Sequence, residues 1–281
     1  MRQNRGMAFS KNRGDGWWIV ATHHAPRIIF LFVLLFFLTS CTSPTAVSPE
    51  ITVFAASSLT DALQETAVVF QAQHPDTIIT FNFAGSSQLA AQLTEGVPAD
   101  VFASANPTQM QNVVEAGRIT ADASRPFVAN KLTLIVPADN PAQLTGLTDL
   151  NRPNIHLILA VPGVPVRQYT DEIVAKLGPD FATAFYNNVV SEEENVRQVA
   201  AKIALGEADA GIIYTSDITP DIAPQVQQIS IPATQNVIAT YLIAPVANSS
   251  QPELARQFIA FILSPEGQII LAKWGFIPLE T

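Results

Sequence analysis

Two pairs of serines stand at positions where an apolar run is followed by a helical pattern. Ser57 and Ser58 follow the run 51–55, and Ser86 and Ser87 follow the run 77–83. A serine at such a junction commonly caps the helix by accepting an N–H bond from its first turn. A helix start also offers free N–H groups and the positive end of a dipole, so hydroxyls there can help to hold an oxyanion. With two such junctions in one half of the chain, an anion site becomes the stronger interpretation.

Nucleophilic catalysis and metal binding are the rival uses of polar residues in this chain. The sequence has no G-x-S-x-G motif, in which a serine nucleophile would stand on a strand-to-helix turn. His74 lies before Pro75, and His156 begins a strand, so neither is next to a serine pair in the sequence. No paired spacing of ligand residues predicts a metal site. We therefore expect a binding protein and no enzyme, with a serine-dependent enzyme as an alternative.

Strands and helices alternate along the chain, and this order predicts how the serines are positioned. The expected strands are 51–55, 77–83, 100–103, 132–136, 155–161, 210–214, 226–231 and 237–244. The expected helices are 59–70, 88–93, 107–116, 167–177, 194–205, 253–263 and 265–273. The alternation predicts a parallel, doubly wound α/β fold, and the length suits two lobes. In such folds ligands bind beyond the carboxyl ends of the strands.

The composition sets limits on partners. The 281 residues are 48% hydrophobic and carry a net charge of −9. The hydrophobic content is sufficient for a large core, and no basic run predicts nucleic-acid binding. Salt screens charges beyond about 10 Å, so local dipoles can still attract an anion to an acidic protein.

The N-terminal segment predicts export. Residues 28–38 form an apolar run of 11 residues, whereas a membrane span needs about 20. The segment Leu38-Thr39-Ser40-Cys41 resembles the bacterial lipobox, after which the cysteine carries lipid. We therefore expect a signal peptide over 1–40, lipidation at Cys41 and a tether over 41–49. Cys41 is the one cysteine of the chain, so the mature body can form no internal disulfide.

Several motifs resemble those of one protein family. They are ITVFAASSLT at 51–60, FAGSS at 83–87, PADVFASA at 98–105, VPV at 164–166, ENVR at 194–197, GIIYTSD at 211–217 and WGF at 274–276. In this order they resemble the molybdate-binding proteins of bacterial molybdate ABC transporters, which are periplasmic-type substrate-binding proteins. The resemblance extends over residues 50–281.

The resemblance implies a fold and a site. The fold is the type 2 periplasmic binding protein, with two doubly wound lobes joined by a hinge, lobe I over 50–128 and 248–281 and lobe II over 129–247. Ser58 and Ser86 would donate hydroxyl and backbone N–H bonds to the anion, and Tyr214 its phenolic O–H. Val166 and Val196 would donate backbone N–H groups only.

The same resemblance implies the ligand and the partners. The ligand would be molybdate or tungstate, with no cofactor and no protein side chain bound directly to the metal. The protein would be an extracytoplasmic monomer that delivers the anion to the permease subunits in the membrane. The same fold with sulfate, phosphate or an organic ligand remains the alternative.

Two positions depart from the family pattern. Arg167 stands where the family commonly has glycine or alanine, and Ser57 stands where alanine is frequent. We expect the Arg167 side chain to point to solvent; contact with the oxyanion or with the opposite lobe is the alternative. Ser57 would either duplicate the cap or touch the ligand.

Overall fold

The structure is a computed structural model that describes residues 48–279. The expected signal peptide and Cys41 lie outside the described residues. The strands are β1 (Glu50–Ala56), β2 (Ile78–Ala84), β3 (Val101–Ser104), β4 (Arg125–Pro137), β5 (Leu157–Ala160), β6 (Val189–Glu193), β7 (Ala210–Tyr214), β8 (Val226–Ser230), β9 (Ile238–Pro245) and β10 (Ile277–Pro278). The α-helices are α2 (Thr60–Gln73), α3 (Ser86–Thr94), α4 (Pro107–Glu115), α5 (Pro165–Ala175), α6 (Pro179–Asn187), α7 (Val196–Ala204), α8 (Pro252–Leu263) and α9 (Pro265–Lys273).

Two sheets share the long strand β4. In the first sheet β1 lies between β2 and β3 in parallel, and β9 adds antiparallel to β3 and to the first half of β4. In the second sheet β5 lies in parallel between β6 and β7, and the second half of β4 pairs antiparallel with β7 and β8. The wholly parallel arrangement expected from the alternation is therefore wrong for β4, β8 and β9.

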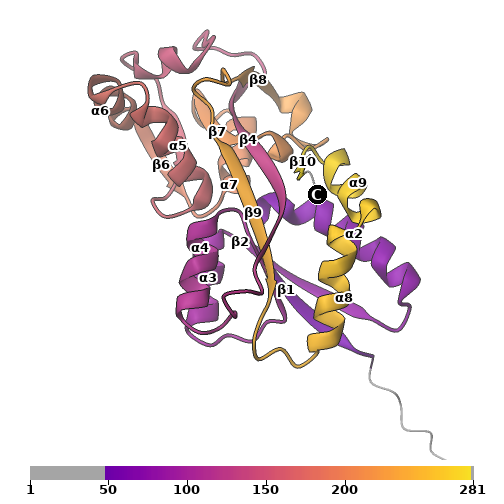
Figure 1. Cartoon of the computed structure of the whole chain (residues 1–281). Helices are drawn as coiled ribbons and strands as arrows, with labels where there is room; N and C mark the ends of the chain where they lie inside the picture. Colours follow the sequence, from indigo (N-terminus) through magenta and orange to yellow (C-terminus); the bar gives the residue numbers. More distant parts are fainter. Residues whose placement is uncertain (1–47, 280–281) are drawn as a thin grey trace, which may run out of the picture. The chain divides into compact units, whose positions relative to one another are not determined.

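The chain passes between the two lobes along β4 and β9, which run through the middle of the fold (Figure 1). β4 pairs with β9 as far as Lys131 and with β7 from Leu132 onward. The change of sheet in mid-strand makes this region the connection between the lobes. The lobe boundaries expected after residues 128 and 247 stay a prediction.

Helices cover both faces of each sheet. In the first lobe α3 and α4 pack on one side, and α2, α8 and α9 pack together on the other (Figure 1). In helix α2 the buried residues recur at helical spacing, so they form one face that packs against the core (Ala62, Leu63, Thr66, Ala67 and Phe70). In the second lobe α7 and α5 contact the sheet, and α6 packs on α5.

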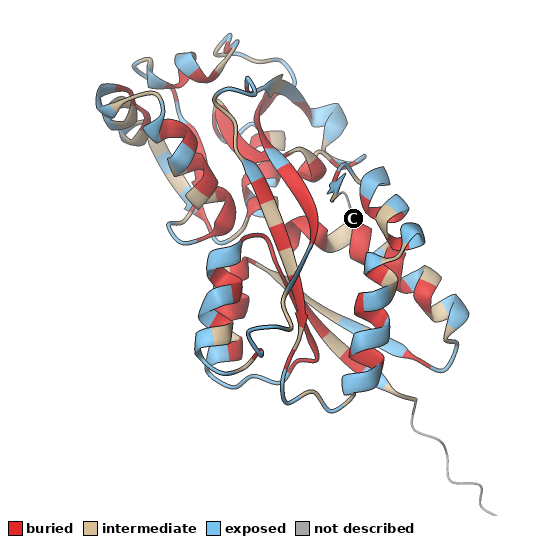
Figure 2. Cartoon of the chain, in the orientation of Figure 1, coloured by how far each residue is buried: buried red, intermediate tan, exposed pale blue. Residues whose placement is uncertain are grey.

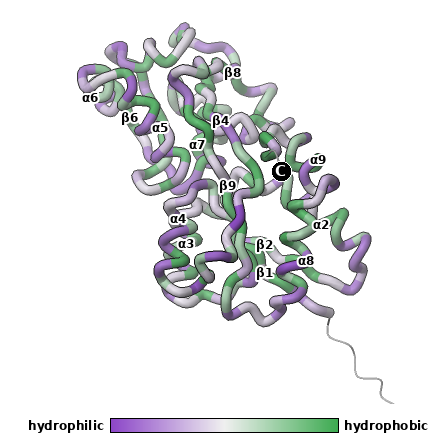
Figure 3. The backbone as a smooth tube through the Cα atoms, viewed as in Figure 1, coloured by the Kyte–Doolittle hydropathy of each residue, from purple (hydrophilic) through white to green (hydrophobic). Residues whose placement is uncertain are grey.

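The core follows the strands and the inward faces of the helices. Figure 2 shows that most of β4 is buried and that buried and intermediate residues alternate along β9, and Figure 3 shows hydrophobic and hydrophilic residues interspersed along the surrounding helices. The element α6 and the strand β6 were missed by the sequence analysis, and β4 begins seven residues before the expected strand at 132.

Candidate functional site

The two serine turns lie next to each other. β1 ends at Ala56, a 3₁₀ turn covers Ser57–Leu59, and α2 follows. β2 ends at Ala84, and α3 begins at Ser86 after the N-cap residue Gly85. Because β1 and β2 are parallel neighbours with Ala56 opposite Ala84, both turns emerge at the same edge of the sheet.

Two helix starts and one strand end approach this edge from the second lobe. Helix α5 begins at Pro165, which puts Val166 in its first turn, and α7 begins at Val196. The Asn195 side chain caps α7 by accepting the N–H groups of Arg197 and Gln198 at 3.0 and 3.2 Å. This cap does not use the N–H of Val196. Strand β7 ends at Tyr214.

These parts line a small cavity between the lobes, with a volume of about 10 Å³ in this closed arrangement. Its lining consists of neutral residues: Ala56, Ser57, Ser58, Ala84, Gly85, Ser86, Ala105, Val164, Pro165, Val166, Val196 and Tyr214. The structure therefore brings together all five residues expected to bind an oxyanion, and Ser57 with them. Their role as ligands stays a prediction.

The hydroxyl of Ser86 is arranged as a hydrogen-bond donor toward the cavity. Its Oγ accepts the backbone N–H of Ala105 at 3.0 Å, and its side chain is buried. A serine hydroxyl has one proton and two acceptor positions, so this bond leaves the proton free for another partner. Ser58 Oγ lies 2.9 Å from the hydroxyl of Tyr241, and either atom can donate in that pair.

The hydroxyl of Tyr214 has no hydrogen-bond partner within residues 48–279, although the residue is only 1% exposed. A buried polar group without a partner costs about 1–3 kcal/mol. Burial raises the pKa of Tyr214 well above its ordinary value, so the group remains a proton donor. An acceptor in the cavity would satisfy this hydroxyl.

The field in the cavity comes from backbone dipoles. The starts of α3, α5 and α7 face it, and each contributes unpaired N–H groups and a positive partial charge. Serine, tyrosine and backbone groups at this site donate hydrogen bonds without a formal charge. The arrangement can hold an anion by donors alone.

A partly buried ion-pair network joins the lobes beside the cavity. Arg197 lies 2.7 Å from Asp61 on α2 and 2.7 Å from Asp217, which follows β7. Burial raises the pKa of Asp217 to about 6, and the attraction of Arg197 opposes that shift. The charge of Arg197 is thus matched by carboxylates on both sides.

Side-chain hydrogen bonds between the lobes surround the cavity as well. Gln88 donates to Glu194, Asn106 donates to Gln168, and Gln109 donates to the carbonyl of Gly163. These pairs join α3 and α4 of the first lobe to the loops and helices of the second. The structure is a closed arrangement of the two lobes.

Arg167 does not line the cavity. Its side chain is 11% exposed, and its guanidinium contacts Asp171 at 2.8 Å, Glu192, and the carbonyl of Ala160. The expectation that it points to solvent is wrong, because carboxylates of its own lobe hold it against the surface. All three of these partners belong to the expected second lobe.

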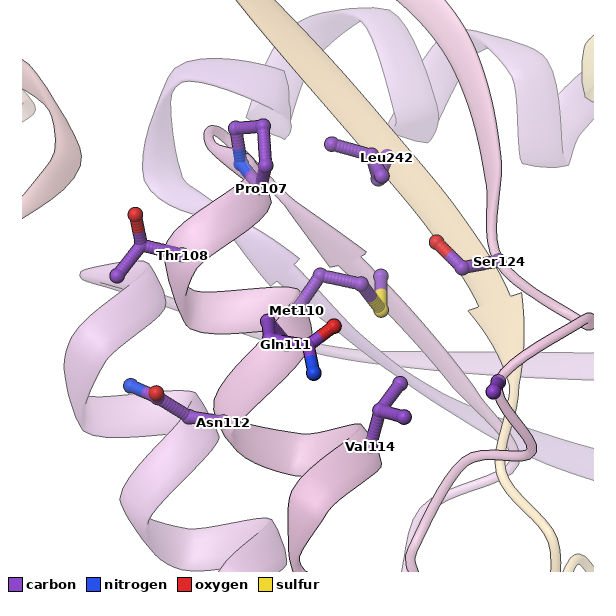
Figure 4. Close-up of a pocket in the computed structure, with 9 residues that line it drawn as sticks. Pro107, Thr108, Met110, Gln111, Asn112, Val114, Ser124 and Leu242 are labelled. Carbon is purple, nitrogen blue, oxygen red and sulfur yellow. The ribbon is translucent and has the colours of Figure 1, made fainter.

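A second, larger hollow of about 600 Å³ lies beside α4 (Figure 4). Met110, Val114, Ser124 and Leu242 line it, and none of the expected site residues does. It is an open groove where no helix starts converge from two lobes. We therefore place the functional site at the smaller cavity.

Other chemistry has little support in the described residues. Neither His74 nor His156 lines the cavity. Residues 48–279 contain no group of three His, Cys, Asp or Glu side chains placed to hold a metal ion. No helix among them is both long and apolar enough to cross a membrane.

Three residues of the site region were missed from the sequence. Gly85 approaches the carbonyl of Glu194, Tyr241 contacts Ser58, and Arg197 joins the lobes. Gly85 and Arg197 stand inside the motifs quoted above, so their positions could have drawn attention. The contact of Tyr241 has no local signal, because 183 residues separate it from Ser58.

Known proteins resemble this chain along most of its length. The family model of the bacterial extracellular solute-binding proteins matches residues 51–277. A molybdate-binding protein of Mycobacterium bovis is 38% identical over 238 residues, which cover 85% of this chain and 88% of the relative. The resemblance stated from the sequence is thereby confirmed.

Solved structures agree with the expected two-lobe fold. The periplasmic molybdate-binding protein of Azotobacter vinelandii superposes with a TM-score of 0.72 at 20% identity, covering 82% of this chain and all of that one. A sulfate-binding protein of Mycobacterium tuberculosis reaches 0.74 at 22% identity, covering 83% and 88%. The expected fold class is confirmed. With a family model matched over nearly all of its described residues, the chain belongs to the bacterial extracellular solute-binding proteins.

Proposed function

We propose that this protein captures molybdate or tungstate between its two lobes and delivers the anion to the permease of an ABC importer. The observation that carries the proposal is the neutral cavity where the hydroxyls of Ser58, Ser86 and Tyr214 meet the starts of three helices. Each hydroxyl can donate to an anion, and the Tyr214 hydroxyl has no other partner among the described residues. The 38% identity to a molybdate-binding protein supports this choice of anion.

In the proposed mechanism the anion holds the lobes together. Ser58 and Ser86 donate from the first lobe, and Val166, Val196 and Tyr214 donate from the second. Only the closed state offers both sets of donors, so the bound anion favours closure by its differential contacts. The closed monomer then docks on the permease and releases the anion there.

Sulfate is the main competitor within the same mechanism. It shares the charge and the tetrahedral shape of molybdate but is smaller, so its oxygens would reach fewer of the fixed donors. The likeness to a sulfate-binding protein concerns the fold alone at 22% identity. We expect the width of the cavity to select the larger anion.

A serine-dependent enzyme is less well supported. A serine nucleophile needs a base within hydrogen-bond reach, and the groups next to Ser58 and Ser86 are a tyrosine hydroxyl and a backbone N–H. The relatives are named as binding proteins. We therefore infer binding without turnover.

We infer further that the protein is a lipoprotein anchored at Cys41. The support is the lipobox-like segment 38–41 after an apolar run. Membrane fractions of cells that produce Cys41→Ser should lose the protein to the soluble fraction. Retention of the variant in the membrane would contradict the anchor at this residue.

Thermal unfolding in the presence of four anions tests the proposed ligand. Ligand at about 100 times its dissociation constant adds about 2.7 kcal/mol to the free energy of unfolding. For a protein of this size that corresponds to a rise of about 5–10 °C in Tm. We expect this rise with molybdate and tungstate, and little with sulfate or phosphate. An equal rise with sulfate would overturn the selection by size, and no rise with any anion would overturn the function.

A further inference from the structure

A second buried tyrosine lies behind the cavity. Tyr241 on β9 is fully buried, and its hydroxyl is 2.9 Å from Ser58 Oγ. Its ring packs edge-on against that of Tyr214, with the centroids 5.7 Å apart. Tyr241 itself does not line the cavity. It therefore contacts one proposed donor from each lobe without reaching the anion.

The direction of the hydrogen bond between Tyr241 and Ser58 follows from the number of hydroxyl protons that the two residues have. Each hydroxyl has one proton to donate. When Ser58 donates to an anion, the proton shared with Tyr241 has to come from the tyrosine. Tyr241 then donates to Ser58 Oγ, and Ser58 donates into the cavity.

The reverse direction has a cost. Ser58 Oγ lies at hydrogen-bond distance from the Tyr241 hydroxyl, whereas the Tyr214 hydroxyl is a further polar neighbour that makes no well-formed bond among residues 48–279. If Ser58 donated to Tyr241, the buried tyrosine proton would lose its well-placed acceptor, which is unfavourable. Ser86 is held in a comparable way, because its Oγ accepts the N–H of Ala105.

We propose that Tyr241 is a positioning and specificity-determining residue, which fixes Ser58 as a donor toward the cavity and so disfavours oxyanions that carry a proton. The proposal rests on the proposed function of the site. A protonated anion such as hydrogen phosphate must donate its own O–H to an acceptor. Ser58 could accept only by reversing its bond with Tyr241. A fully ionised anion needs donors alone and pays no such penalty.

The substitution Tyr241→Phe tests this role because it keeps the ring that packs on Tyr214 and removes only the hydroxyl. Titration calorimetry with molybdate and with phosphate would give the two dissociation constants. We expect molybdate binding to weaken about tenfold, as for the loss of one hydrogen bond in a buried network. Phosphate binding should stay the same or tighten, because Ser58 is then free to accept. Tyr186→Phe is the matched control, since that hydroxyl bonds Asp171 away from the cavity.

A double-mutant cycle with Ser58→Ala distinguishes positioning from mere packing. If Tyr241 acts through Ser58, Tyr241→Phe should change molybdate affinity less than about twofold in the Ser58→Ala background. A full tenfold loss in that background would overturn the proposal, and so would an equal loss for both anions. Thermal unfolding without ligand verifies that each variant is folded. If phosphate binds too weakly to titrate, the double-mutant cycle measured with molybdate is sufficient to test the proposal. Failure of the wild-type protein to bind molybdate would instead overturn the proposed function.

Discussion

Arg197 on α7 and Asp61 on α2 form an ion pair of 2.7 Å that joins the two lobes beside the cavity. Arg197 also contacts Asp217 at 2.7 Å and approaches the carbonyl of Ser58 at 3.5 Å. The same residue follows Val196, whose N–H is a proposed donor to the anion. Closure of the lobes and completion of the site are therefore linked through one turn of α7.

Asp61→Asn should weaken anion binding while leaving the fold intact. Both partners are partly exposed, with 24% of the Arg197 side chain and 30% of the Asp61 side chain accessible. The pair then contributes about 1 kcal/mol to closure, so molybdate affinity should fall about fivefold. Titration calorimetry measures the affinity, and thermal unfolding without ligand should show little change. Unchanged affinity would mean that this pair does not stabilise the closed state.

Gly85→Ala should hinder closure by contact with the opposite lobe. A Cβ at residue 85 would lie 2.5 Å from the carbonyl oxygen of Glu194. The backbone of Gly85 has φ −61° and ψ 136°, which alanine adopts without strain, so the clash is the one cost. Overpacking of about 1–3 kcal/mol corresponds to a loss of affinity between about fivefold and one hundredfold.

Gly146→Ala serves as the control for this substitution, because nothing lies within 4 Å of a Cβ there. Titration of both variants with molybdate makes the comparison. Equal affinities of the two variants would show that the approach of Gly85 to Glu194 is not required in the bound state.

Tyr214→Phe should shift stability and affinity in opposite directions. The hydroxyl is buried and has no partner among the described residues, so its removal should stabilise the ligand-free protein by up to about 1 kcal/mol. For a domain of this size that raises Tm by about 2–4 °C. Loss of a hydrogen bond to an anion should weaken molybdate binding about tenfold to one hundredfold. A lower Tm together with unchanged affinity would show that the hydroxyl serves the fold and not the ligand.

The contribution of Asp217 to the free energy of unfolding should fall as pH rises. Its pKa is raised from 3.8 to about 6 by burial, so the folded state binds this proton more tightly than the unfolded state does. The contribution is fully present below about pH 4 and is lost as pH rises through about 6. The unfolding free energy of the wild-type protein minus that of Asp217→Asn should therefore fall from pH 4 to pH 7. Denaturant titrations at several pH values measure it. A difference that grows with pH would show that Arg197 lowers the pKa of Asp217 more than burial raises it.

The sequence was most informative where side-chain type and position carry the chemistry. Ser58 and Ser86 were found because hydroxyls at strand-to-helix junctions are a local signal, and the structure places both in the cavity. Val166 and Val196 were named only through a family resemblance. Their proposed role uses backbone N–H groups, and the residue type of a valine says nothing about that.

Long-range pairing explains what was missed in the fold. Residues 125–131 contain Pro126 and Asn130, which favour loops, but antiparallel pairing with β9 extends β4 through them, with a register shift after Pro126. Tyr241 pairs with β4 through its backbone, and only the folded arrangement brings its hydroxyl to Ser58. Such contacts depend on how the two lobes are joined, which local patterns do not encode.

The central claim is that one oxyanion bridges the lobes inside the serine-lined cavity, and anomalous diffraction tests it directly. Crystals of the protein grown with molybdate would be measured at the molybdenum absorption edge. We predict one strong peak in the cavity, with anion oxygens within hydrogen-bond distance of the hydroxyls of Ser58, Ser86 and Tyr214 and of the N–H groups of Val166 and Val196. A peak at another place, or none in the cavity of a protein that binds molybdate in solution, would contradict the account.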